Sequence, residues 1–373
     1  MIRVGITGQQ GFIGTHLYNF LGLENDMERI PCPRETISSG DALRDFVRKC
    51  NVIVHLAGIN RHENPEALYQ GNVNLAQRLI SAMEAEGVAP HVLFSSSTQE
   101  ERDNPYGSAK LECRRLFDKW AENRGGKFTG LVIPNVFGPF GKPNYNSVVA
   151  TFCYKLTHGE FPEIHQDNTI RLIYINDLCR EMIRIMREEV RENPYFVPHG
   201  AEIKVSEILE LLYLYKNTYF DQKIIPEIKN YFEQCLFNTF VCYIEPEDFF
   251  PVRLTPHSDN RGSFVEVIKL DGTGGQVSFS NTVAGVTRGN HYHIRKFERF
   301  AVIRGKALIQ LRRIGSEKVF DFEINADECP AFVDMPIWYT HNITNIGDND
   351  LYTIFWISEF FDPDDPDTFH AEV

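Results

Sequence analysis

The stretch GITGQQGFIG, residues 5–14, decides the fold of the first part of the chain. Gly8, Gly11 and Gly14 directly follow an apolar strand pattern and come where a helical pattern begins. Glycines let a backbone turn tightly and approach a pyrophosphate, and a helix N-terminus offers free N–H groups and the positive end of its dipole. In this strand–turn–helix context the spacing predicts a dinucleotide site. The alternative is a tight turn without a ligand.

Apolar strand patterns and longer helical patterns alternate over the first 130 residues. The expected strands cover residues 2–7, 52–58, 91–97 and 128–134, and the expected helices cover 66–87 and 104–125. This alternation predicts a Rossmann-type, doubly wound parallel sheet with helices on both faces.

The second half of the chain changes in character twice. Residues 145–243 are mostly helical in pattern and predict a small α-rich substrate part. The acidic, Pro-bearing stretch 244–252 predicts a linker, and after it come Gly-punctuated β patterns typical of a sandwich or barrel. We therefore expect an α/β domain at 1–243 and an all-β domain at 244–373.

Composition narrows the possible partners. The chain has 373 residues and a net charge of −13, so nucleic acid and anionic membrane surfaces would repel it. Its apolar runs are far shorter than the roughly 20 residues of a spanning helix. The eight cysteines form no C-x-x-C pair, and no signal peptide is evident, which together indicate a reducing cytoplasm.

The residue after the expected second strand bears on the choice of cofactor. Rossmann folds that bind NAD often carry an acid there, whereas this chain reads RIPCPRET with Arg34 in the corresponding place. A guanidinium suits a 2′-phosphate, so Arg34 favours NADPH over NADH. The alternative is a solvated surface arginine.

A second motif, SSSTQEERDNPYGSAK, carries Tyr106 and Lys110 four residues apart, on one face of a helix. A neighbouring ammonium makes a tyrosine a better acid–base group at neutral pH. Ser97, at the end of a strand, is the expected carbonyl-orienting hydroxyl, with Thr98 as the alternative. The predicted catalytic residues are Ser97, Tyr106 and Lys110.

A third motif, HYHIRKFE, begins at His291. Strand alternation places His291 and His293 on one side, and neighbouring strands would supply Glu298 and His341. Imidazoles with a carboxylate suit Zn²⁺ or another divalent first-row metal. We therefore expect a metal site formed by His291, His293, Glu298 and His341.

The front of the chain resembles the extended short-chain dehydrogenase/reductase family. HLAG (55–58), Asn72 and LIYINDL (172–178) also resemble sequence motifs of that family. The resemblance implies that Tyr106 is the proton donor, Lys110 its partner and cofactor ribose ligand, and Ser97 the holder of a carbonyl. The residues expected to bind the cofactor are Gly8, Gly11, Phe12, Ile13, Gly14, Arg34, Leu56, Ala57, Gly58 and Asn72.

The rear of the chain resembles the cupin barrel family in its first motif. The second motif departs from the family pattern, since Pro330 and Trp338 stand where glycine is usual. DNRGSFVE (259–266) resembles the start of sugar 3,5-epimerase cupins, where Arg261 would meet a phosphate or simply cap a turn.

As a whole the chain resembles CapF-type bifunctional enzymes of capsular polysaccharide synthesis, through stretches such as DNPYGSAK, GNHYH and FDPDDPDTFHAEV. The resemblance implies a UDP-sugar substrate, a homodimer, and two steps toward UDP-N-acetyl-L-fucosamine, namely epimerisation at carbon 3 in the cupin and reduction of the 4-keto group by NADPH. Alternatives are a reductase with a structural or dimerising cupin, a 4-epimerase, and a catalytically inactive NADPH-sensing or sugar-binding regulator.

Overall fold

The computed structural model describes residues 1–272 and 274–373. These residues form two compact units, each built from separate parts of the chain. The first unit contains Met1–Phe137 and Asn168–Lys204, and the second contains Gly138–Asp167 and Val205–Val373. The helical segment before residue 244 thus packs largely with the β-rich segment. The domain division at residues 243 and 244 stays a prediction.

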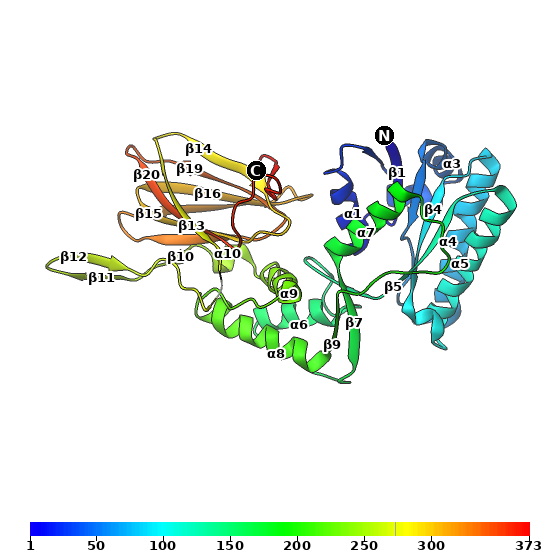
Figure 1. Cartoon of the computed structure of the whole chain (residues 1–373), viewed down its shortest axis with the longest axis horizontal. Coiled ribbons are helices and arrows are strands. Elements are labelled where there is room, and N and C mark those ends of the chain that lie inside the picture. Colours follow the sequence, from blue (N-terminus) through cyan, green and yellow to red (C-terminus); the bar gives the residue numbers. More distant parts are fainter. Residues whose placement is uncertain (273) are drawn as a thin grey trace. The chain divides into compact units, whose positions relative to one another are not determined.

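The first unit is built on a parallel sheet (Figure 1). Its strand order is β2-β1-β3-β4-β5-β8. Its strands are β1 (Ile2–Thr7), β2 (Met27–Ile30), β3 (Val52–His55), β4 (His91–Ser97), β5 (Phe128–Ile133) and β8 (Tyr195–Phe196). The predicted α/β fold is therefore confirmed. The order of strands reverses between β1 and β3, which is where open α/β sheets bind their ligands.

Helices cover both faces of this sheet. They are α1 (Phe12–Leu21), α2 (Arg34–Ser38), α3 (Gly40–Lys49), α4 (Pro65–Glu86), η1 (Thr98–Glu101), α5 (Pro105–Arg124) and α7 (Ile175–Glu188). The long helices α4 and α5 begin alike, because Asn64 and Asn104 cap them through side-chain oxygens and a proline occupies the first helical position. Buried Leu79, Phe94 and Phe117 join α4, β4 and α5 in one core.

A smaller sheet completes the first unit and was not expected from the sequence. Its strands are β6 (Asn135–Phe137), β7 (Thr169–Tyr174) and β9 (Ala201–Lys204). β7 and β9 fall within the region predicted to be mostly helical. β9 has only four residues, and only the second half of β7 is buried.

Within residues 205–272 and 274–373, the β-rich part forms two five-stranded antiparallel sheets beside the hairpin of β11 (Pro256–Asp259) and β12 (Gly262–Val265). One has the order β10 (Val252–Arg253), β18 (Ala331–Met335), β15 (Glu298–Arg304), β20 (Leu351–Ile357) and β13 (Gln276–Thr282). The other has the order β17 (Val319–Asn325), β16 (Lys306–Arg313), β19 (Tyr339–Asn345), β14 (Thr287–Tyr292) and β21 (Phe369–His370). Buried side chains of both sheets, such as Phe300, Ile309 and Val333, share one core. This is the expected cupin-like barrel.

Other elements of the second unit are a hairpin and several helices. They are α6 (Val148–Thr157), α8 (Val205–Tyr215), the π-helix η2 (Lys216–Asp221), α9 (Tyr231–Val241), α10 (Pro246–Phe249), β11 (Pro256–Asp259) and β12 (Gly262–Val265). Along the described residues, no helix has the length and apolar character needed to cross a bilayer.

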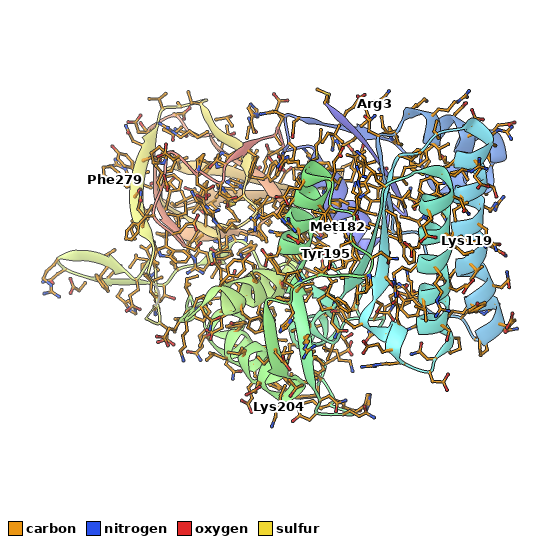
Figure 2. The ribbon with its side chains drawn as sticks, turned by 45° about the vertical axis from the view of Figure 1, so that its right-hand side comes forward. Arg3, Lys119, Met182, Tyr195, Lys204 and Phe279 are labelled. Carbon is orange, nitrogen blue, oxygen red and sulfur yellow. The ribbon has the colours of Figure 1, made fainter. Side chains whose placement is uncertain are left out.

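Side chains follow the expected division between interior and solvent (Figure 2). Met182 of α7 is fully buried, whereas Lys119 lies on the exposed side of α5. Phe279 is an exception, since it stands on the edge strand β13 and is exposed.

A buried ion pair fixes the barrel to its helices. Arg299 of β15 donates to both carboxylate oxygens of Asp334 on β18, at 2.7 and 2.9 Å. Tyr219 of η2 donates to the same carboxylate at 2.7 Å. All three side chains are essentially inaccessible, so this network couples η2 to the strand that begins with Glu298.

Candidate functional site

The glycine-rich turn lies at the carboxyl end of β1. Gly8 adopts a φ of +77°, and a Cβ there would lie 2.7 Å from the backbone nitrogen of Ala57. A Cβ on Gly14 would lie 2.3 Å from the carbonyl oxygen of Gly8. Gly11 precedes α1, whose first amides, those of Phe12 and Ile13, belong to an end without a side-chain cap. The turn is therefore shaped for the close approach of a phosphate group.

The segment after β3 forms the other wall of this turn. Leu56 donates a backbone hydrogen bond to Thr7 (3.0 Å), and Ala57 and Gly58 follow it. Asn72 of α4 is buried beneath the segment, where it accepts from Ile59 N and donates to Ile59 O, both at 2.9 Å. The amide of Asn72 thus braces the loop that would face the cofactor.

Arg34 begins α2, shortly after β2, and is exposed. The loop before it is tied to the glycine-rich turn, because Cys32 N donates to Gln9 Oε1 (3.3 Å). Arg34 therefore lies at the same edge of the sheet as the glycine-rich turn, and its contact with a 2′-phosphate stays a prediction.

The predicted catalytic residues come from neighbouring elements. Ser97 ends β4, and its hydroxyl accepts a hydrogen bond from Gln99 N (3.2 Å), which leaves its own proton to donate. Lys110 lies one helical turn after Tyr106, with its ammonium 5.7 Å from the centre of the tyrosine ring. The ammonium is buried and donates to Ser95 O (2.9 Å), and burial lowers the pKa of Lys110 to about 8.

The short connection between Ser97 and Tyr106 is held by an ion pair that sequence reasoning missed. Glu100 of η1 accepts two-pronged hydrogen bonds from Arg114 of α5, at 2.9 to 3.1 Å, and the hydroxyl of Ser96 also contacts this carboxylate. Arg114 also donates to Asn193 (2.8 Å). The only signal in the sequence was an acid and a base 14 residues apart, which is too common to interpret.

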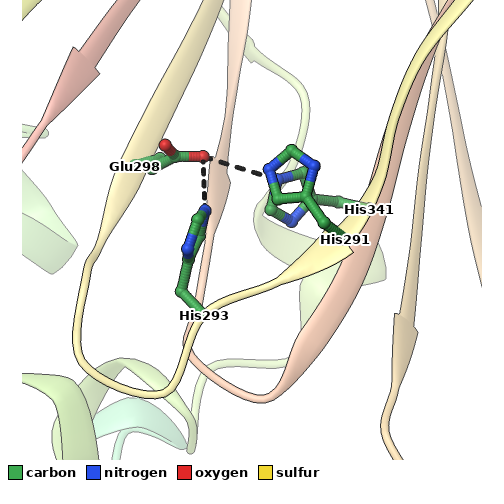
Figure 3. Close-up of side chains that lie close together, drawn as sticks. All are labelled: His291, His293, Glu298 and His341. Carbon is green, nitrogen blue, oxygen red and sulfur yellow. Dashed lines mark ion pairs between the residues drawn. The ribbon is translucent and has the colours of Figure 1, made fainter. Parts of the chain in front are cut away.

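The predicted metal ligands come together in the barrel (Figure 3). His291 lies on β14, His293 directly follows that strand, Glu298 begins β15 and His341 lies on β19. Their ligand atoms all lie within 4.8 Å of one another. Oε2 of Glu298 is 3.2 Å from Nε2 of His293 and 3.4 Å from Nε2 of His341.

The orientation of two imidazoles suits a metal ion. Nδ1 of His293 faces the carbonyl oxygen of Asp367 at 2.5 Å, and Nδ1 of His341 faces that of Tyr339 at 3.2 Å. A carbonyl only accepts, so each Nδ1 is the donor and each Nε2 is directed at Glu298. Both Nε2 atoms and Oε2 are buried, and among the described residues none finds a hydrogen-bond partner of acceptable geometry.

The spacing of the ligand atoms and the charges of their groups also suit a metal ion. Tetrahedral ligands ~2.1 Å from zinc lie ~3.4 Å apart, close to the 3.2 and 3.4 Å that separate Oε2 of Glu298 from Nε2 of His293 and of His341. Burial, with the neighbouring imidazoles, lowers the pKa of His291 to about 4, which keeps it neutral as a ligand must be. Burial opposes ionisation of Glu298, but His293 and His341 outweigh it and hold its pKa well below the usual range. The donor set therefore fits a divalent cation.

Trp338, which stands where glycine is usual in the second cupin motif, keeps the backbone conformation of a glycine. Trp338 takes a φ of +63°, the left-handed conformation that glycine favours. The backbone N–H of Trp338 donates to His293 O (2.7 Å). Its buried indole stacks on Tyr292, with 5.7 Å between the ring centres. Trp338 thus preserves the turn while filling the space beside His293. Arg261, in the turn of the β11–β12 hairpin, pairs with Asp259 of the same turn.

Comparison with known proteins agrees with this architecture. Residues 4–197 match the NAD dependent epimerase/dehydratase family, and residues 257–369 match the polysaccharide biosynthesis C-terminal domain. A UDP-2-acetamido-2,6-beta-L-arabino-hexul-4-ose reductase of Pseudomonas aeruginosa is 35% identical over 100% of this chain and 99% of its own length.

Solved structures show the same pairing of domains. The capsular polysaccharide assembling protein CapF of Staphylococcus aureus is 34% identical, with each chain covered over 100% of its length and a TM-score of 0.64. RMD of Pseudomonas aeruginosa, solved with NADPH, is 23% identical over 58% of this chain and 83% of its own, with a TM-score of 0.53, and shares the fold of the front part. The chain therefore belongs to the CapF-type family of capsular polysaccharide biosynthesis proteins, in which an epimerase/dehydratase-type domain is followed by a polysaccharide biosynthesis C-terminal domain.

Proposed function

We propose that this chain is a bifunctional nucleotide-sugar enzyme. Its cupin-like part epimerises carbon 3 of a UDP-2-acetamido-2,6-dideoxy-4-hexulose. Its Rossmann-type part then reduces the 4-keto group with NADPH to UDP-2-acetamido-2,6-dideoxy-L-talose, on the route to UDP-N-acetyl-L-fucosamine. The observation that carries the proposal is the full-length similarity to an enzyme named for reduction of a UDP-linked 4-ketosugar.

In the reduction, the glycine-rich turn and Arg34 would hold NADPH, which would supply the hydride. Ser97 donates a hydrogen bond to the ketone oxygen, and Tyr106 gives its proton to the alkoxide that forms. The ammonium of Lys110 stabilises the tyrosinate left behind, since it lies 5.7 Å from the ring centre. The buried position of Lys110 keeps water from screening this interaction.

In the epimerisation, the 4-keto group acidifies the proton on carbon 3, which a base in the barrel removes, and the enolate that forms then takes up a proton on the opposite face. Zn²⁺ or another divalent first-row metal, held by His291, His293, Glu298 and His341, would polarise the ketone as a Lewis acid or order the pocket. Reduction then removes the ketone, so the new configuration at carbon 3 is locked. The order of the two steps follows from this chemistry.

The test is solvent exchange in deuterated water with the 4-keto UDP-sugar and no NADPH, read by NMR. We expect deuterium at carbon 3 with the full-length protein and none with His341→Ala. With NADPH added, Tyr106→Phe should lose nearly all NADPH oxidation. Oxidation that persists in Tyr106→Phe would refute the reductase assignment.

The same experiment separates the alternatives. No exchange at carbon 3 together with NADPH consumption would indicate a reductase whose cupin-like part is structural or dimerising. A 4-epimerase would show no net NADPH consumption, and a sensing or binding protein would show no turnover. The homodimer implied by the family resemblance stays a prediction, to be checked by the mass of the protein in solution.

A further inference from the structure

The last residues of the chain lie against the segment that carries the candidate metal ligands. β21 pairs antiparallel with the end of β14, so that His370 is opposite His291 and Phe369 is opposite Tyr292. Ala371 N donates to Asn290 O (3.0 Å). The C-terminal segment therefore adds a strand directly beside the ligand-bearing edge of the sheet.

Asp367 makes the contacts closest to the ligands. It is 4% exposed, and its backbone has a φ of +41°, a left-handed conformation uncommon for a residue with a side chain. Its carboxylate accepts from the successive N–H groups of Ile294 (3.2 Å), Arg295 (3.0 Å) and Lys296 (2.8 Å). These residues form the loop that leaves His293 and leads to Glu298.

The carbonyl of the same residue holds the ring of His293, since Nδ1 donates to Asp367 O at 2.5 Å. One residue therefore fixes both the imidazole and the backbone that follows it. Such a contact sets the tautomer of a metal-binding histidine and the direction of its other nitrogen. Here that nitrogen, Nε2, faces Glu298.

Two basic residues of the loop attach to the same C-terminal segment. Lys296 is 1% exposed at its side chain and donates from Nζ to Pro366 O (2.7 Å). Arg295 pairs with Asp365 (2.9 Å) and with Glu359 (2.9 Å). The acidic C-terminal stretch is thus matched in charge to the loop, and its attachment is not confined to one hydrogen bond.

We propose that Asp367 is a positioning residue of the metal centre, and that the C-terminal segment is an integral part of that centre. This inference rests on the metal site of the proposed function. The carboxylate of Asp367 fixes the 294–296 loop and thereby places its own carbonyl against His293. Without it, the ring of His293 loses its orientation toward the other ligands.

The test compares Asp367→Asn with Asp365→Asn in the full-length protein. Asparagine keeps the shape but offers one acceptor oxygen, so an N–H of the loop faces an amide N–H₂. Asp365→Asn removes the same charge two residues away, at a side chain that is 68% exposed. We expect Asp367→Asn to bind Zn²⁺ about 10- to 100-fold more weakly in competition with a chromogenic chelator, and Asp365→Asn to bind as the wild type does.

Cobalt(II) in place of zinc provides a readout that a merely structural role would leave unchanged. Its visible absorption reports coordination geometry, so Asp367→Asn should lose intensity in the tetrahedral bands at saturating metal. Equal affinity and an equal spectrum for Asp367→Asn and the wild type would overturn the inference. Wild-type protein that binds neither metal would overturn the metal site of the proposed function as well, so the two failures are distinct.

A second variant covers the case in which Asp367→Asn does not fold. Ala371→Pro removes the N–H that bonds to Asn290 O, near the partly exposed end of the segment. It should weaken Zn²⁺ binding at least threefold, because the strand beside His291 loosens. Unchanged Zn²⁺ binding in Ala371→Pro would refute the role of the segment.

Discussion

Replacing Lys110 by methionine should abolish reduction and yet stabilise the first unit at neutral pH. Lys110 is 4% exposed, and burial lowers its pKa from the usual 10.5 to about 8. At about 1.4 kcal/mol for each tenfold change in the proton equilibrium, the buried charge costs about 3 kcal/mol. Loss of the hydrogen bond to Ser95 O offsets about 1 kcal/mol, which leaves a net gain of roughly 2 kcal/mol.

The sign of this effect depends on pH. Below pH 8 the lysine is charged in both the folded and the unfolded chain, so the full burial cost is present. Between about pH 8 and 10.5 the unfolded chain holds the proton and the folded chain does not, so wild-type stability rises with pH. The advantage of Lys110→Met should therefore shrink through this window and reverse above it, where only the lost hydrogen bond remains.

The assay is urea unfolding of both proteins at pH 7 and at pH 10.5, with limited proteolysis and mass spectrometry to assign the transition to residues 1–137. NADPH oxidation is measured in parallel and should fall at least 100-fold. A variant that is less stable than the wild type at pH 7, or a stability difference that does not change with pH, would show that the burial cost has been misjudged.

Other predictions concern the ion pairs and the cofactor. Glu100→Gln should lower kcat for reduction roughly tenfold with little change in KM for NADPH, because it loosens the connection between the catalytic residues. The control is Glu101→Gln at the exposed neighbouring position, and equal kcat values for the two variants would contradict the role of Glu100. Tyr219→Phe should lower the free energy of unfolding in urea titration by about 2 kcal/mol, since it loses a hydrogen bond to a buried carboxylate. Tyr215→Phe loses a hydrogen bond to a neutral carbonyl and should lower it by about 1 kcal/mol, and the reverse ranking would be inconsistent with a charged acceptor for Tyr219. Arg34→Ala should raise KM for NADPH at least tenfold and leave KM for NADH nearly unchanged, and a parallel rise in both would speak against 2′-phosphate recognition.

Local patterns in the sequence predicted much of the fold. The strand, the glycine-rich turn and the helix at residues 2–21 follow from short-range periodicity and from glycine geometry. Tyr106 and Lys110 share a helix face because of their spacing alone. Spacing also indicated the candidate metal ligands, since HYHIRKFE supplies two histidines and the glutamate, and the structure brings them together with His341.

The small β6-β7-β9 sheet could not be predicted in the same way. Its strands come from three separate stretches of chain, and two of them, β6 and β9, have only three and four residues. Which stretches pair is decided by the tertiary fold and not by the β preference of each stretch alone. For the same reason the sequence did not indicate that residues 205–243 pack with the β-rich segment.

The sequence by itself indicated the type of chemistry that we propose, because glycine geometry, helix spacing and ligand type are local properties of the chain. Only the tertiary structure decided how those groups are held. Asp367 binds the loop after His293 from 74 residues away, through backbone N–H and carbonyl groups that every residue possesses. Glu100 and Arg114 likewise meet only because η1 folds back on α5. Hydrogen bonds to the backbone do not depend on residue type. The sequence therefore does not distinguish a buried acid such as Asp367 from the exposed acids around it in the C-terminal stretch.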